Sequence, residues 1–194
     1  MEFKDLVKKR RSCRGFLSEV VSAEQLEFIL EAARWAPSPL NLQPFETVIV
    51  TDPIIKRRIR EIAEDAQKEV ARKDGPKWAQ QYDMQFLEEA PVLLVVVVDL
   101  TRAGLGKYFG QKYGSIQAGS AFVQNLLLAA TDIGLSALWF TFFNPEDLRH
   151  LLIIPDNMEI LAVVPVGKPK VRADTVPRKA LKLYGQSYGT PYIF

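Results

Sequence analysis

A basic cluster near the N-terminus is the first group of residues that could do chemistry. Arg10, Arg11, Ser12 and Arg14 fall within five residues, at the end of an expected short helix. Guanidinium groups and a hydroxyl can hold a phosphate through charge-assisted hydrogen bonds. The alternative is that the arginines only complement the negative end of the helix dipole and add solubility. The abrupt change of polarity after Arg11, into Ser-Cys-Arg-Gly-Phe, favours a phosphate site.

The proline-rich segment 36–45 is the second such group. Between its prolines stand Ser38, Asn41 and Gln43, whose side chains both donate and accept hydrogen bonds. They could surround the polar edge of a heteroaromatic ring, or Ser38 and Asn41 could only cap turns between the prolines. A turn does not need Gln43 before Pro44. A phosphate site and a polar, planar site in one domain suggest a nucleotide or flavin ligand.

The remaining reactive side chains show no catalytic pattern. Arg178 alone would be a surface charge, whereas beside Arg10 and Arg14 it would complete a phosphate clamp, a pairing that sequence does not reveal. His150 has no acidic or serine partner at a suggestive spacing. The neighbouring arginines would lower the pKa of the Cys13 thiol. No His or Asn lies near Cys13 in the sequence to support a nucleophile, so a small buried residue is the simpler interpretation.

Composition limits the class of protein. The 194 residues are enough for one sizeable domain, 1–194, and 48% hydrophobic with 25% charged residues indicates a globular chain. A net charge of +2 argues against a nucleic-acid partner. One Cys and one His argue against a disulfide or a metal site of the zinc type. The longest apolar run, 91–98, is far too short to span a membrane, so we expect a cytoplasmic protein with small-molecule partners.

Patterning predicts helices and strands in an irregular alternation. Strands are expected at 45–51, 92–99, 136–142 and 159–166. Helices are expected at 3–11, after Ser22, at 53–72, about 76–89, 111–133 and after Asn144. Neither a G-x-G-x-x-G nor a phosphate-binding G-x-x-x-x-G-K-[ST] motif is present. An α+β layered sheet therefore fits better than a doubly wound parallel one.

The C-terminal segment, about 170–194, has no strong periodicity but is rich in aromatic residues. It ends in Tyr184, Tyr188, Tyr192 and Phe194. A segment this apolar is expected to pack on a surface, and a second subunit is one candidate.

Two motifs together carry a resemblance to a known family. Arg10-Arg11-Ser12-x-Arg14-x-Phe16, followed by Ala36-Pro37-Ser38-x-x-Asn41-x-Gln43-Pro44, resembles the FMN-dependent nitroreductase family. The similarity continues through 124–135, 166–169 and Pro177-Arg178. It implies an α+β fold with a central, mostly antiparallel sheet flanked by helices. It also implies a homodimer with FMN at the subunit interface and a C-terminal tail that packs on the partner subunit.

The resemblance also assigns cofactor contacts, in three groups. The phosphate and ribityl end of FMN would be bound by Arg10, Arg11, Ser12, Arg14 and Arg178. The ring would be approached from the partner subunit by Pro37, Ser38 and Asn41, with Gln43 nearby. The ring would also run along the backbone of Phe140, Thr141 and Phe142.

The implied reaction is carried by the flavin. NADH or NADPH would give hydride to FMN, and an electron-poor nitroaromatic, quinone or flavin would then take it in a ping-pong mechanism. No catalytic acid or base and no metal is implied. The alternatives are a flavin-fragmenting or dehalogenating relative and a non-catalytic FMN-binding module. Flavin-fragmenting relatives tend to have an acidic residue where Ser12 stands, which argues against the first of these.

Two departures from the family pattern bear on substrate choice. Phe45 follows Pro44 where the family often has Trp, and residues 72–90 contain no motif that aligns with it. The sequence therefore leaves open the acceptor, the preference between NADH and NADPH, and the pocket residues, especially those within 72–113.

Overall fold

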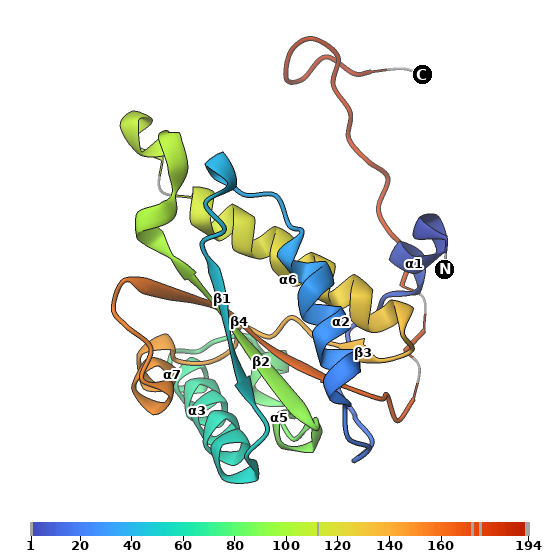
Figure 1. The fold of residues 1–194 in the computed structure, drawn as a ribbon, viewed down its shortest axis with the longest axis vertical. Coiled ribbons are helices and arrows are strands. Elements are labelled where there is room, and N and C mark those ends of the chain that lie inside the picture. Colours follow the sequence, from blue (N-terminus) through green and yellow to red (C-terminus); the bar gives the residue numbers. More distant parts are fainter. Residues whose placement is uncertain (1, 112, 172, 175, 193–194) are drawn as a thin grey trace.

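A four-stranded antiparallel sheet forms the centre of the fold (Figure 1). The computed structural model describes residues 2–111, 113–171, 173–174 and 176–192. The strand order is β1-β2-β4-β3. The strands are β1 (Phe45–Val50), β2 (Val92–Asp99), β3 (Ser136–Ala137) and β4 (Met158–Gly167). The α+β class predicted from the sequence, with a mostly antiparallel sheet between helices, is confirmed.

The two long strands are central because their side chains are apolar on both faces. Every residue of β2 is buried, and Val95 lies opposite Val163 of β4. Rows of β-branched residues suit a pleated surface covered on both sides. The predicted strand 136–142 is much shorter than expected, since only Ser136 and Ala137 pair regularly. The opposing β4 residue is Pro165, which has no N–H to donate, so the regular ladder stops there.

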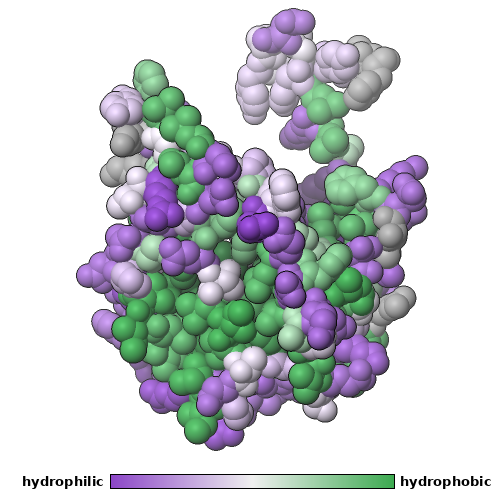
Figure 2. Space-filling model, in the orientation of Figure 1, coloured by the Kyte–Doolittle hydropathy of each residue, from purple (hydrophilic) through white to green (hydrophobic). Residues whose placement is uncertain are grey.

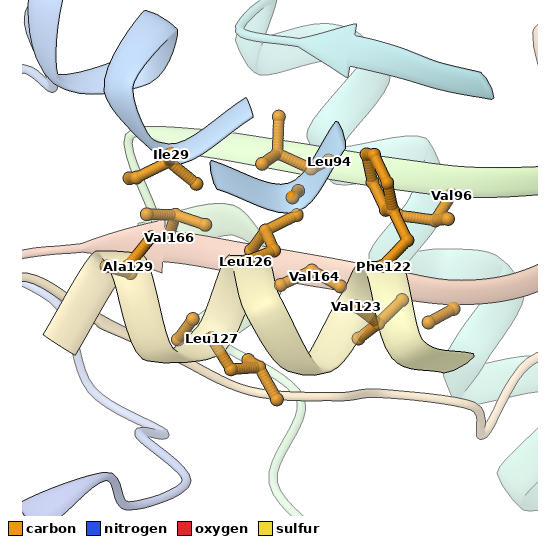
Figure 3. Packing of buried hydrophobic residues seen from close by; sticks show 14 of the residues in the cluster. Ile29, Leu94, Val96, Phe122, Val123, Leu126, Leu127, Ala129, Val164 and Val166 are labelled. Atoms are coloured by element: carbon orange, nitrogen blue, oxygen red, sulfur yellow. The ribbon is translucent and has the colours of Figure 1, made fainter. Parts of the chain in front are cut away.

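Helices cover both faces of the sheet. On one face α2 (Ala23–Arg34) and α6 (Gly114–Asp132) pack over the strands and share one hydrophobic core. Figure 3 shows Leu126 of α6 beside Val164 of β4, and the ring of Phe122 beside Val96 of β2. On the other face lie α3 (Pro53–Arg72), α5 (Phe86–Glu89) and α7 (Pro145–Leu152). The sheet is thus the middle layer of three.

Local signals place the helix ends as the sequence predicts. Ser22 and Gln25 form the reciprocal capping box at the start of α2. Asp52 accepts hydrogen bonds from the first turn of α3, and Asn144 does the same for α7. Gly134, with φ of 83°, follows the end of α6 in the left-handed conformation that favours glycine.

Three helical segments differ from expectation. The first helix, α1 (Phe3–Lys9), stops before the arginine cluster. The helix predicted over 76–89 is divided into α4 (Lys77–Gln80) and α5, because the carboxylate of Asp83 accepts a hydrogen bond from the Gln85 N–H at 2.9 Å and turns the chain. Residues preceding α6 form short 3₁₀ turns, η2 (Leu100–Arg102) and η3 (Gly104–Phe109).

The C-terminal segment leaves the main body beside α1 and runs away from it (Figure 1). It closes into a small hairpin in which Tyr184 bridges Pro191. Its side chains are exposed, with Tyr188 at 92% and Leu181 at 83%. In Figure 2 it stands apart from the body, as does the arm around η3. Packing of this tail on a partner subunit stays a prediction, and Phe194 lies outside the described residues.

No helix within the described parts of the chain is long and apolar enough to cross a membrane.

Candidate functional site

The sheet edge at β3 fixes the position of the arginine cluster. Ser12 forms a parallel bridge with Ala137, and the Cys13 N–H donates to the Ala137 carbonyl at 3.2 Å. Phe16 bridges Pro169 and its ring is buried. The segment that carries the arginines is therefore anchored at both ends, while the arginine side chains are left at the surface or half-buried.

The charge of Arg178, from the C-terminal segment, acts on Arg10 in the folded protein. Burial lowers the pKa of Arg10, and the positive charges of Arg11 and Arg178 lower it further. Among the residues that the structure describes, no carboxylate forms an ion pair with Arg10 or Arg178. Like charges held together without a counter-ion disfavour each other, and a bound anion would relieve that repulsion. This is the environment that a phosphate needs.

Arg11 donates hydrogen bonds to three backbone carbonyls around the cluster. Its Nη1 donates to the backbone carbonyls of Lys8, at 2.5 Å, and Arg10, at 2.6 Å. Its Nε donates to the carbonyl of Asp174 at 3.1 Å. Arg11 thus links the end of α1 to the C-terminal segment at Asp174, four residues before Arg178.

Arg14 faces a different element. Its Nε donates to the hydroxyl of Tyr82 at 2.6 Å, and its guanidinium carbon lies 5.5 Å from the centre of the Tyr82 ring. Sequence reasoning missed Tyr82, because residues 72–90 carry no motif and the contact joins residues far apart in the chain. The one local signal was its place among the aromatic residues Trp78 and Phe86.

The loop that carries Ser38, Asn41 and Gln43 is closed by its own side chains. Ser38 Oγ accepts from the Gln43 N–H at 3.0 Å, and Asn41 Oδ1 accepts from Gln43 Nε2 at 3.1 Å. Leu40, Asn41 and Gln43 all have positive φ, at 52°, 54° and 45°. Such backbone conformations cost free energy and tend to be kept where they serve a site. Pro37, Asn41 and Gln43 are exposed and Ser38 is half-buried.

The loop and the arginine cluster lie at opposite ends of α6. Pro39 of the loop approaches Gly114, the first residue of α6. Lys8, Lys9 and Arg11 share a cavity of about 170 Å³ with Thr131 and Gly134, at the other end of the helix. A helix of 19 residues is roughly 28 Å long. The two predicted halves of the site therefore do not meet within one chain.

Within the third predicted group, residues 140–142, Phe140 differs from the other two residues in its backbone hydrogen bonding. The N–H and C=O of Phe140 both bond to Val163, and the Phe140 ring packs on Phe86 with centroids 5.5 Å apart. Thr141 is exposed and Phe142 half-buried. No backbone bond involving these two is found among the described residues, so Thr141 and Phe142 keep groups to offer to a ligand, whereas Phe140 is a core residue.

The Cys13 thiol differs from expectation. Burial raises its pKa above the ordinary thiol value, while the hydrogen bond to the Gly15 carbonyl and the charge of Arg14 lower it by less. The predicted lowering by the arginines is present but smaller than the effect of burial. Cys13 is a buried structural residue and not an activated nucleophile.

Comparison with known proteins gives this arrangement a family. A model described as the nitroreductase family matches residues 7–168. The chain belongs to this family. Two relatives indicate the range of activities within it. Iodotyrosine deiodinase 1 of Sus scrofa is 33% identical over 93% of this chain, which spans 66% of the length of that protein. A protein of Archaeoglobus fulgidus named putative NADH dehydrogenase/NAD(P)H nitroreductase is 31% identical, covering 87% of this chain and 86% of that one.

A solved structure of an FMN-bound protein also resembles this chain of the nitroreductase family. Oxidized iodotyrosine deiodinase bound to FMN and 3-iodo-L-tyrosine superimposes with a TM-score of 0.83 at 27% identity. The match covers 95% of this chain and 99% of that one. FMN, predicted from the arginine and proline motifs, is thus supported as the cofactor, and the chain is an enzyme of the nitroreductase superfamily.

Proposed function

We propose that this protein is an FMN-dependent oxidoreductase that moves hydride from NADH or NADPH to an electron-poor acceptor such as a nitroaromatic, a quinone or a flavin. One observation carries the proposal: the positive charges of Arg11 and Arg178 act on the partly buried Arg10, and no carboxylate among the described residues forms an ion pair with it. A terminal phosphate is the part of FMN that such a pair fits, because it brings two negative charges and several acceptor oxygens.

The residues around this pair fit the rest of the cofactor. Ser12, fixed by its bridge to Ala137, adds a hydroxyl next to the arginines. Arg14 offers a further cation beyond Ser12, on the side of Tyr82. FMN, when bound, supplies the hydride chemistry. The chain itself would hold the phosphate, orient the ring and place positive charge where the reduced ring becomes negative.

The proposed enzyme is a homodimer with FMN at the subunit interface. The loop with Ser38 and Asn41 and the arginine cluster are at opposite ends of α6, a separation that supports a complete site built from two copies. The apolar tail beyond Arg178 is proposed to hold the second copy. A cytoplasmic location remains a prediction from the sequence.

The test is spectroscopic. The purified protein should carry, or take up, FMN and show the yellow flavin absorption. Under anaerobic conditions NADH or NADPH should bleach it, and menadione or nitrofurazone should restore the colour. Colourless protein that takes up no FMN would refute the cofactor. Yellow protein that neither nicotinamide bleaches would favour a non-catalytic module or a different electron donor.

Reductive dehalogenation of an aromatic amino acid is the second candidate, and a specific finding favours it. Several relatives are named iodotyrosine deiodinases, and the FMN-bound structure described above holds 3-iodo-L-tyrosine. The measurement is release of iodide and formation of tyrosine from iodotyrosine by the dithionite-reduced protein. Iodide release without turnover of menadione would make this the main activity. Turnover of menadione without iodide release would exclude dehalogenation as the activity.

A further inference from the structure

Two contacts fix the guanidinium of Arg14 against Tyr82. The hydrogen bond from Arg14 Nε to the tyrosine hydroxyl is 2.6 Å long, and the ring lies under the guanidinium with 5.5 Å between its centre and the guanidinium carbon. A hydrogen bond limits direction and a cation–π contact limits tilt. Arg14 is otherwise an exposed side chain at the surface, which would sample many rotamers in solution.

Tyr82 is itself held from two sides. Gln67 of α3 donates through Nε2 to the carbonyl of Tyr82 at 2.8 Å and to that of Ala79 at 2.6 Å. The Tyr82 ring meets Trp78 and Phe86 edge-on, with centroids 6.2 and 6.1 Å apart. Phe86 belongs to the buried core. The position of the Tyr82 hydroxyl is therefore fixed by the hydrogen bonds of Gln67 and by ring packing.

The bond to Tyr82 uses only one of the five N–H groups of Arg14. No acceptor is bonded to the terminal Nη atoms within the described chain, so their N–H groups remain available to a ligand. An arginine oriented through Nε presents its two terminal nitrogens as a fixed pair, the geometry that matches paired oxygen acceptors.

We propose that Tyr82 is a positioning residue for FMN, which acts through Arg14. It holds the guanidinium in the orientation that the cofactor needs, so that less side-chain freedom is lost when FMN binds. This inference rests on the proposed FMN site. It gives the segment 77–85, which has no recognisable motif, a specific role in that site.

The test is a double-mutant cycle on FMN affinity, measured by titrating the purified apoprotein with FMN. Tyr82→Phe keeps the ring and removes the hydroxyl, and we expect it to weaken FMN binding about 3- to 10-fold, as loss of one such hydrogen bond would. In the Arg14→Ala background the same substitution should have no further effect. The reduction potential of bound FMN should become more negative in Tyr82→Phe, because the positive charge of Arg14 would be less firmly held near the cofactor.

Trp78→Phe is the matched control. Trp78 meets the Tyr82 ring edge-on, and no hydrogen bond or cation–π contact joins it to Arg14 among the described residues, so FMN affinity and potential should be unchanged. An equal loss of affinity for Tyr82→Phe in both backgrounds would overturn the inference, because Tyr82 would then act independently of Arg14. Unchanged or tighter binding in Tyr82→Phe would also overturn it. Wild-type protein that does not bind FMN would refute the proposed function itself, and this inference with it.

Discussion

Pro39 packs directly on the α-carbon of Gly104. A side-chain carbon at Gly104 would lie 2.5 Å from the β-carbon of Pro39, and one at Gly114 would lie 3.1 Å from its γ-carbon. Gly104 is the first residue of the 3₁₀ turn η3, and Gly114 is the first residue of α6. The arm around η3 therefore supports the loop that carries Ser38 and Asn41, and its position and the shape of the loop are linked.

Gly104→Ala should disturb this support. Gly104 has φ of 76°, so alanine would bring backbone strain together with a clash against Pro39. We expect the free energy of unfolding to fall by about 2–4 kcal/mol, measured by urea denaturation. Gly110→Ala is the matched control, because Gly110 has φ of 72° with nothing within 4 Å, so only the strain of about 1–2 kcal/mol applies. Equal losses of unfolding free energy in the two variants would show that the clash with Pro39 adds nothing to the backbone strain.

Arg10→Gln should stabilise the protein without FMN and weaken FMN binding. The lowered pKa of Arg10 reports that its charge is disfavoured by burial and by Arg11 and Arg178. Removing that charge should raise the midpoint of thermal unfolding at low ionic strength. Inorganic phosphate should raise the midpoint of the wild type more than that of the variant. Lys182→Gln, with the same change of net charge on the exposed tail, is the control. A midpoint lower for Arg10→Gln than for the wild type would contradict the interpretation that the charge of Arg10 is not neutralised in the fold.

Cys13→Ala should change how stability depends on pH. Because burial raises the pKa of the Cys13 thiol, the folded protein keeps this proton at pH values where the unfolded chain has lost it. The stabilisation is complete below the unfolded pKa of about 8.5 and is lost as the pH rises through the folded pKa. Above pH ~8.5 the free energy of unfolding should therefore fall more steeply for the wild type than for Cys13→Ala. Parallel pH profiles would show that the thiol is not protected in the fold.

Gln67→Ala should loosen the segment between α3 and α5. The substitution removes two partly buried hydrogen bonds, to the carbonyls of Ala79 and Tyr82, at about 0.5–1.5 kcal/mol each. Limited proteolysis should then cut within 73–85 faster than in the wild type. Gln80→Ala, which removes one exposed bond of 3.3 Å to Gly75, should leave the rate almost unchanged. Equal cleavage rates for the two variants would show that the hydrogen bonds of Gln67 do not restrain this segment.

Truncation after Lys179 should convert the proposed dimer to a monomer or weaken it markedly. The removed segment holds exposed Leu181, Tyr184 and Tyr188, which would lose water on packing against a second copy. Light scattering coupled to size-exclusion chromatography gives the mass directly. A truncated protein that remains fully dimeric at micromolar concentration would assign the tail another role.

The sequence by itself determined features that depend on neighbouring residues. Ser22, Asp52 and Asn144 cap their helices through bonds to residues two or three positions away, so short patterns suffice to predict them. The arginine cluster and the proline-rich loop were also visible, because each gathers its chemistry within a few residues. The strand at 136–142 was overestimated because the proline that interrupts its pairing stands on β4.

The tertiary structure alone decided how these pieces meet. The charge of Arg178 acts on Arg10, and Arg11 bonds to a backbone carbonyl of the C-terminal segment. Tyr82 reaches Arg14 because Gln67 and the core fix its segment. The length of α6 separates the loop from the cluster. Such relationships depend on the packing of elements that are distant in the chain. Packing arises from the summed burial of many side chains, and a short sequence pattern does not contain it.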